Sequence, residues 1–171
     1  MDFKKLIPDF SVIAKTDWAK PNLDTKNKTW LIMAGAALLM VVFAFIPWQT
    51  VTQNSASAST LGVATWYGIL GLLSALVVVY GVLYNQVKFV FCGAVLGAVL
   101  GLLGALLTTG VTIAGVSISA EVVKAWAKGA KDPETDEVVK ATVSHIGAIL
   151  FLVASLAAAA VSFLQIKKEN E

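Results

Sequence analysis

The sequence predicts an all-α membrane fold, a four-transmembrane-helix bundle with a small extracytoplasmic β-hairpin or sheet and a short amphipathic helix. One observation behind this prediction is composition, because 57% of the 171 residues are hydrophobic, 14% are charged and the mean hydropathy is +0.77. The other is the position of the charges, since all 24 fall in 54 residues and none occurs in 29–87, 89–120 or 141–166. A water-soluble fold needs charge on the outer face of its helices or strands, so several membrane spans are expected.

Residues 1–28 are predicted to form a cytoplasmic N-terminal segment with a possible interfacial helix. The stretch 9–20 has a fair helical pattern, Asp9 is placed to cap it, and Pro8 and Pro21 delimit it. A loosely ordered tail with scattered apolar residues accounts for the same stretch equally well. Both interpretations stay open at this point.

The four-span membrane domain, residues 29–166, begins with a predicted span over about 30–48. Nineteen residues at about 1.5 Å each approach the ~30 Å thickness of the hydrocarbon core. Trp30 and Trp48 mark its two ends, because amphipathic rings favour the headgroup level. Pro47 falls in the last turn, where it ends the helix without breaking it.

The first apolar stretch could instead belong to a secretory signal peptide, with Ala56-Ser57-Ala58 as the cleavage site. The charged region before it spans 28 residues, and the apolar region spans about 18, so both are too long for a signal peptide. The site also lies about ten residues beyond the apolar end. A retained first span is therefore the preferred interpretation.

The second span is predicted over about 61–84. Trp66 and Tyr67 mark one membrane interface and Tyr84 marks the other, as the aromatic belts of membrane proteins do. The connection 85–88 is too short for anything but an antiparallel helical hairpin. The third span should therefore run back across the membrane beside the second.

The third span is predicted over about 89–109 and the fourth over about 143–166, each bounded by polar sequence. A cytoplasmic tail, 167–171, follows and begins with two lysines. Because lysines near span ends are retained on the cytoplasmic side, their distribution also sets the orientation of the bundle.

Lysine counts place both termini on the cytoplasmic side of the cytoplasmic (inner) membrane. Nine of the 13 lysines lie in the N-terminal segment, the turn at 85–88 and the tail, whereas the outside loop 110–142 holds four and the outside loop 49–60 holds none. This asymmetry is the one that the positive-inside rule expects of a multi-pass protein.

The first outside loop is predicted to form a β-hairpin. Residues 49–53 and 55–60 alternate small or β-branched side chains around Asn54, which is typical of two strands joined by a turn. The alternative is a solvated polar loop. A hairpin here would leave an edge strand open to a partner.

The second outside loop is predicted to contain a strand over 111–119 that could pair with this hairpin. An amphipathic helix over 121–131 should follow, with Trp126 as a further membrane-interface anchor, and 132–136 reads as an exposed turn. Together the two loops would form a small cap above the bundle.

Small residues recur in stripes on the second and third spans. They are Gly93, Gly97, Gly101 and Ala105 on the third span, and Ala64, Gly68, Gly71 and Ala75 on the second. Such stripes let two helix backbones approach closely in lipid. Either they pack the helices of one chain together, or one stripe faces a second protomer or another membrane protein. The expected partners are therefore the lipid bilayer and, if one stripe faces outward, a second copy in a homo-oligomer or another membrane protein.

Catalytic, metal and cofactor chemistry finds little support in this composition. The chain has one histidine, His145, and one cysteine, Cys92, so no ordinary zinc or haem site can be completed within it. An enzyme would have to use His145 with Glu121 and Asp136 outside the membrane. Nucleic-acid binding is not expected, because the N-terminal lysines are interleaved with aspartates.

Two short motifs carry a resemblance to known proteins. Phe45-Ile46-Pro47-Trp48 and Trp66-Tyr67-Gly68, with the β-forming loop between them, resemble small bacterial four-helix integral membrane proteins of uncharacterised function. The layout also resembles the claudin-like tetraspan architecture. The paired cysteines of the claudin first loop are missing here, so the resemblance implies the architecture and no site residues.

These observations predict a non-enzymatic integral membrane protein. It would serve as an assembly, scaffold or partner-binding subunit that acts through its small-residue helix faces and its extracytoplasmic cap. The alternative is a small channel or transporter subunit formed by oligomerisation. The hydroxyls available to line its path are Ser74, Thr108, Thr109, Ser155 and Ser162.

Overall fold

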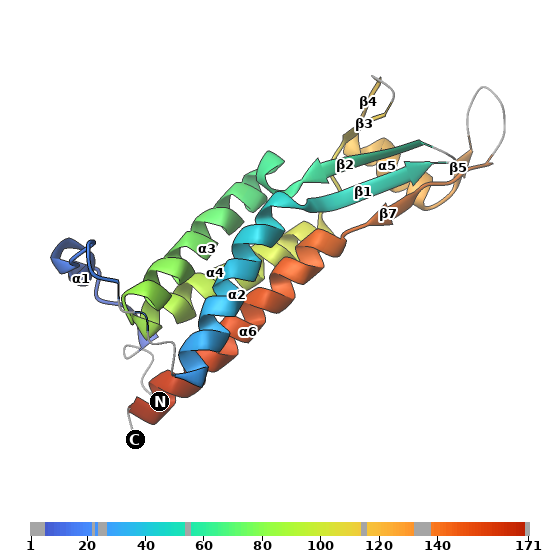
Figure 1. The fold of residues 1–171 in the computed structure, drawn as a ribbon. Helices are drawn as coiled ribbons and strands as arrows, with labels where there is room; N and C mark the ends of the chain where they lie inside the picture. Colours follow the sequence, from blue (N-terminus) through green and yellow to red (C-terminus); the bar gives the residue numbers. More distant parts are fainter. Residues whose placement is uncertain are drawn as a thin grey trace.

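Four long helices form a bundle that carries a small β-structured cap at one end (Figure 1). The computed structural model describes residues 6–21, 23, 27–53, 56–113, 116–131 and 138–169. Within this part of the chain, the helices long and apolar enough to cross a membrane are α2 (Lys28–Phe45), α3 (Trp66–Leu83), α4 (Val87–Leu106) and α6 (Ile146–Glu169). The predicted multi-pass, four-helix architecture is therefore confirmed at this level.

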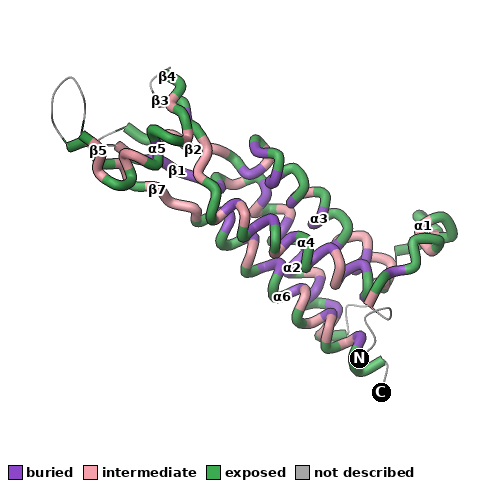
Figure 2. Tube along the Cα trace, turned by 180° about the vertical axis from the view of Figure 1, so that it is seen from behind, coloured by how far each residue is buried: buried purple, intermediate pink, exposed green. Residues whose placement is uncertain are grey.

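The four helices pack in a ring, in which α2 and α4 each contact both α3 and α6. Met33 and Met40 of α2 and Phe151 of α6 fill the centre. The outer faces are also apolar, with Leu38 and Leu73 among the exposed side chains, as lipid-facing surfaces require. Figure 2 shows the buried positions along the inner faces of the helices and the exposed ones outside.

Polar caps and one left-handed residue define the helix ends. The Asn27 side chain accepts the Thr29 N–H at 3.0 Å at the start of α2, and Thr65 Oγ1 accepts the Gly68 N–H at 3.1 Å at the start of α3. Asn85, with a φ of 53°, turns the chain from α3 into α4. The predicted antiparallel hairpin of these two helices is confirmed.

The first two predicted spans are wrong at their outer ends. The first helix stops at Phe45 and not at Trp48, because Pro47 disfavours a helical conformation at Ile46, which is extended (φ −85°, ψ 164°). The second helix begins at Trp66 and not near Leu61. Between them the chain forms strands and a short 3₁₀ turn, Gly62–Ala64.

The other two predicted spans also differ at the ends nearest the cap. The α4 helix ends at Leu106 instead of 109, and α6 begins at Ile146 instead of 143. Leu107 is extended and Val143 and Ser144 belong to β7, so the chain leaves the helical conformation before the uncharged sequence ends. At the opposite end α6 runs on to Glu169.

The loop between α2 and α3 forms the predicted antiparallel hairpin, β1 (Pro47–Gln53) with β2 (Ala56–Leu61). Asn54, at the predicted turn, lies outside the described residues. A third strand, β7 (Thr142–Ser144), pairs with the other side of β1, which gives the order β2-β1-β7.

The third strand of this sheet differs from the prediction. Within 111–119, β3 (Val111–Ile113) and β4 (Val116–Ile118) pair with each other in a separate antiparallel sheet. The physical reason lies in the bundle: β1 continues from α2 and β7 leads into α6, and because α2 and α6 are neighbours, the two strands emerge side by side.

The predicted amphipathic helix is present as α5 (Ala120–Ala127), capped by Ser119, whose side chain accepts the Val122 N–H at 3.5 Å. It is shorter than the predicted 121–131, because Gly129, with a φ of 78°, turns the chain out of the helix. Its Val123 packs with Val51 and Val111 in a small core beneath the cap. Beyond it β5 (Ala130–Lys131) pairs with β6 (Val138–Val139). The predicted turn at 132–136 lies outside the described residues.

The N-terminal helix α1 (Ser11–Lys15) is shorter than the predicted 9–20. The N-cap is Phe10 and not the predicted Asp9, although the Asp9 carboxylate accepts the Ser11 N–H at 2.9 Å, and the chain becomes extended at Thr16. Figure 1 places α1 and the end of α6 at the end of the bundle opposite the cap.

Candidate partner-binding cap

Trp48 joins the cap to the bundle. It is the second residue of β1, and only 1% of it is exposed. Its indole Nε1 donates to the Phe43 carbonyl at 2.7 Å, and its ring lies 5.1 Å from Phe151 and 5.8 Å from Tyr67, centroid to centroid. The prediction of Trp48 as a membrane-interface anchor is therefore corrected, because protein encloses the ring on all sides.

Three glycines make room for this ring. A Cβ atom at Gly104 would lie 2.5 Å from Trp48 Cε3, and one at Gly71 would lie 3.1 Å from Cη2. A Cβ atom at Gly62 would lie even closer to the indole nitrogen. Only Gly71 belongs to a predicted stripe. Gly62 and Gly104 were missed because nothing in the sequence indicates that a tryptophan from a loop enters the bundle.

A buried glutamine forms a second joint between the cap and the bundle. Gln49 is 2% exposed, and its Oε1 accepts the Thr109 N–H at 2.7 Å and the Thr109 hydroxyl at 3.1 Å. Its Nε2 donates to the Thr109 carbonyl at 2.9 Å. These bonds fix the start of β1 to the chain just after α4. In the sequence Gln49 is one more polar loop residue, so this role could not be found there.

The stripe on the third span packs against helices of the same chain. A Cβ at Gly93 would lie 3.0 Å from the Ser74 carbonyl oxygen of α3, one at Gly97 would lie 2.7 Å from Met40 Cε of α2, and one at Gly101 would lie 3.0 Å from Leu152 Cα of α6. Ala105 is partly buried beside the core. The stripe on the third span therefore packs helices of one chain together, which is one of the two interpretations of the sequence.

The stripe on the second span also points mostly inward. Gly68 lies against the Gly62 backbone, Gly71 lies against Trp48, and Ala75 is fully buried. Ala64 is exposed, because it belongs to the 3₁₀ turn before the helix. Neither stripe therefore offers a continuous outer face for a second protomer.

The predicted interface anchors divide into enclosed and exposed rings. Trp30 is buried and donates its indole N–H to the Val82 carbonyl at 3.0 Å, and Tyr67 is buried beside Trp48. Trp66 is 60% exposed, whereas Tyr84 and Trp126 are half-buried. Of this set, Trp66 most nearly keeps the outward position that an anchor needs.

The hydroxyls available to a channel are turned inward. The side chains of Ser74, Ser155 and Ser162 are buried and donate to carbonyls of their own helices, at 2.7, 2.8 and 2.7 Å. Thr109 is bonded to Gln49. These serines therefore form no polar stripe on the outside of the bundle.

His145 lies between β7 and α6 and forms a hydrogen bond with the Leu107 backbone. Its Nε2 is buried and has no hydrogen-bond partner among the described residues. Burial lowers the pKa of the imidazole, and the Leu107 hydrogen bond opposes part of this effect. Glu121 is exposed on α5, and Asp136 lies outside the described residues. Within the described ranges, no three His, Cys, Asp or Glu side chains are grouped to hold a metal.

The outer edge of β2 faces the β3–β4 hairpin, and β3 lies close to it. In the part of the chain that the structure describes, β2 is hydrogen-bonded to β1 alone. A cleft of about 540 Å³ separates its last three residues from the β3–β4 hairpin. The residues that line it are all uncharged: Ser59, Thr60, Leu61, Ala64, Gly110, Val111, Thr112, Ser117 and Ile118.

No protein family, curated protein or solved structure matches this chain. The resemblance to small bacterial four-helix proteins and to the claudin-like layout therefore stays a prediction. The geometry of the cap and of the bundle is what a proposal about function has to rest on.

Proposed function

We propose that this chain is a non-enzymatic, multi-pass protein of the cytoplasmic membrane that acts as a partner-binding subunit, and that β2 receives an extended segment of its partner. The observation that carries the proposal is an edge of β2 that, among the described residues, pairs with no strand and lies beside a neutral cleft. Proteins usually protect such edges with charge, proline or a bulge. The β2 sequence, Ala56–Leu61, contains neither a charge nor a proline.

The chemistry of the edge favours a β-strand as the ligand. Alternate residues of β2 direct their backbone N–H and C=O groups away from β1, and another strand supplies acceptors and donors at the same spacing. Hydroxyls of Ser59, Thr112 and Ser117 lie around the cleft and no charged side chain lines it. A charged segment would lose its hydration there without a counter-ion, so the preferred ligand is uncharged.

The cap is also held firmly enough to serve as a binding surface. Trp48 is locked between α3, α4 and α6, and Gln49 is bonded to Thr109, both within the strand that pairs with β2. A strand edge that is fixed before binding loses less conformational entropy when its partner arrives. This supports a docking role better than a flexible loop would.

The direction of β2 favours a different protein over a second copy as the partner. The β1 strand leads away from the bundle and β2 returns towards it (Figure 1). Two copies in one membrane would both have β2 running towards the bilayer, so they could pair only in parallel. Antiparallel pairs are slightly more stable and outnumber parallel pairs, so a strand running away from the bilayer fits better.

The test places a photo-crosslinking residue at Ser59, inside the cleft, and in a second variant at Ser57, exposed on the same strand but outside the cleft. In native membranes, Ser59 should crosslink to an uncharged segment of one protein, identified by mass spectrometry of the linked peptide. The charge variant Ser59→Lys should abolish recovery of that protein, and Ser57→Lys should retain it.

Two outcomes contradict the proposal. One is a Ser59 crosslink that joins only lipid or only a second copy of the chain. The other is equal recovery of the partner from Ser59→Lys and from wild type. No specific observation favours the hypothesis of an oligomeric channel, because the serines that would line its path are buried inside the bundle.

A further inference from the structure

The N-terminal segment lies against the α3–α4 hairpin at the end of the bundle opposite the cap. Pro8 is buried, and the Cys92 thiol donates to the Leu6 carbonyl at 3.6 Å. Cys92 is five residues beyond the start of α4 at Val87, or about 7 Å along the helix. The segment therefore overlaps the first turns of a membrane span, at the depth where interfacial helices sit.

An aromatic cluster holds the segment in place. The ring of Phe10 packs edge-on against Phe89 at 5.5 Å, and the ring of Trp18 lies 5.5 Å from each of Tyr80 and Tyr84. The Tyr84 hydroxyl donates to the Trp18 carbonyl at 3.1 Å. These contacts join residues more than sixty positions apart, so they fix the segment to the bundle and not merely to itself.

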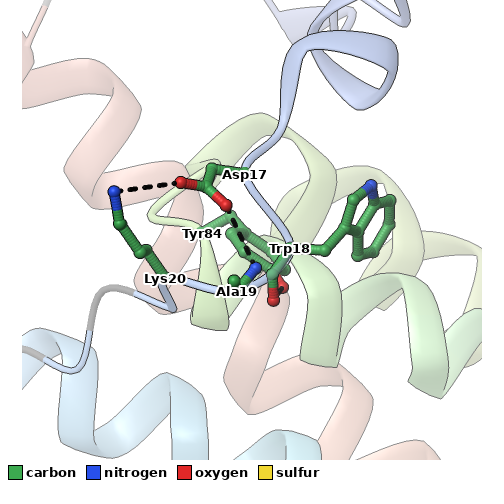
Figure 3. Close-up of polar contacts among 5 residues, drawn as sticks. All are labelled: Asp17, Trp18, Ala19, Lys20 and Tyr84. Carbon is green, nitrogen blue, oxygen red and sulfur yellow. Dashed lines mark hydrogen bonds and ion pairs between the residues drawn. The ribbon is translucent and has the colours of Figure 1, made fainter.

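The same side chains also present apolar surface outward. Ile7 is 60% exposed, Phe10 66% and Trp18 61%, although each belongs to the segment packed on α3 and α4. Figure 3 shows the Trp18 ring extending from the chain beside the helices. Beside a membrane span, exposed rings of this kind contact the boundary between headgroups and acyl chains.

The charges at this end are mostly positive. The N-terminal segment, the α3–α4 turn and the tail carry nine lysines against six acids. Asp17 accepts the Ala19 N–H at 3.2 Å and pairs with Lys20 at 3.4 Å (Figure 3). The Asp9 carboxylate accepts the Ser11 N–H. Hydrogen bonding with Ser11 lowers the pKa of Asp9, and the positive charges of Lys15 and Lys88 lower it further. Lys15 and Lys88 therefore both act on the Asp9 carboxylate, although they are far apart in the sequence.

We propose that residues 6–21 form a lipid-binding strap that selects anionic phospholipids, with Phe10 and Trp18 immersed at the acyl boundary and Lys15 and Lys88 contacting the headgroup phosphates. Apolar immersion supplies the membrane attachment, and lysines close to the surface supply the preference for negative charge. The strap acts at the opposite end of the bundle from the proposed partner-binding edge and does not depend on it.

The test reconstitutes the full chain in phosphatidylcholine vesicles that contain trace spin-labelled phosphatidylglycerol or phosphatidylcholine. Electron paramagnetic resonance gives the association constant of each labelled lipid with the protein. We expect phosphatidylglycerol to bind more tightly, by roughly fivefold for each lysine that contacts phosphate at low salt. The preference should weaken in 1 M salt, where the screening length is about 3 Å.

A double variant, Lys15→Gln with Lys88→Gln, should remove most of this preference. The matched control, Lys124→Gln with Lys128→Gln, changes two exposed lysines at the cap end and should leave the preference unchanged. Equal association of the two lipids with wild type overturns the proposal. So does an equal loss of preference in the two double variants.

A second measurement tests the immersion of the strap independently of its charge. Vesicles with brominated acyl chains should quench tryptophan fluorescence of wild type more than that of Trp18→Phe, because bromine quenches indoles within the bilayer. Circular dichroism confirms that the variant keeps its helices. Equal quenching of the two proteins would mean that Trp18 lies outside the membrane and would overturn the proposed strap.

Discussion

The two ends of the bundle use aromatic rings in opposite ways. At the cap end, Trp48 is enclosed by glycines of three elements and by Phe151, so its ring connects the sheet to the helices of the bundle. At the other end, Trp18 and Phe10 pack on the bundle with one face and leave the other face exposed. An enclosed ring fixes internal geometry, whereas a half-packed ring at a span end offers surface to the bilayer.

Removal of the enclosed ring should have the largest effect. Trp48→Ala deletes a fully buried indole and its hydrogen bond to Phe43, so the free energy of unfolding should fall by about 3–5 kcal/mol. Thermal unfolding in detergent, followed by circular dichroism, measures the change. Trp66→Ala removes a side chain that is 60% exposed and is the matched control; its free energy of unfolding should fall far less. Equal losses would show that enclosure of Trp48 contributes nothing.

Crowding of the same ring should have the next largest effect. The Cβ of Gly104→Ala would lie 2.5 Å from Trp48, so the indole or α4 must shift, at about 1–3 kcal/mol. Gly35→Ala is the control, because nothing lies within 4 Å of its new Cβ and alanine favours helix by up to about 1 kcal/mol. The same unfolding measurement applies. If the two variants behave alike, the close packing around Trp48 is contradicted.

The polar joint should matter somewhat less than the aromatic one. Gln49→Leu removes the bonds to Thr109 and leaves its N–H without that acceptor, so the variant should lose about 1–3 kcal/mol. Hydrogen exchange should also rise at Thr109 and in β1, whereas α3 should stay protected. Gln53→Leu, at the half-buried end of the same strand, serves as control. Unchanged hydrogen exchange at Thr109 would contradict the proposed role of the Gln49 hydrogen bonds in holding β1 to the bundle.

Acidification should have the smallest effect, confined to the cap end. Burial lowers the pKa of His145 below its ordinary value of 6.5, so the unfolded chain binds a proton more readily than the folded chain. Stability is therefore fully present above about pH 6.5 and falls as the pH drops from there towards the folded pKa. Melting temperatures of wild type and His145→Gln between pH 8 and 5 measure this. Parallel pH profiles would show that His145 contributes nothing.

The hairpin and α5 were predictable because local signals agree with the fold. The alternation on either side of residue 54 predicts β1 and β2, and the amphipathic pattern after residue 120 predicts α5. The pairing of β7 with β1 was not predictable. It joins residues about ninety positions apart, and their meeting depends on the neighbouring positions of α2 and α6 in the bundle.

The candidate site could be predicted only in outline. Hydropathy and alternation indicate an uncharged edge strand at β2, but the cleft beside it needs residues 110–112 and 117–118 to fold into a separate hairpin. The strap was left open between a helix and a tail. The contacts of its rings with Tyr80, Tyr84 and Phe89 show that the segment packs on the bundle. No local sequence pattern relates those three rings to Phe10 and Trp18.

By itself, the sequence determined the class of fold, the approximate spans and the outer hairpin, because the absence of charge over long stretches can be read one residue at a time. Only the tertiary structure decided which small residues and which tryptophans face inward. The physical reason is that lipid-facing and core-facing surfaces of a membrane helix are both apolar, so periodicity does not separate them. Trp48 and Trp66 look alike in the chain, and packing alone makes one a joint and the other a surface.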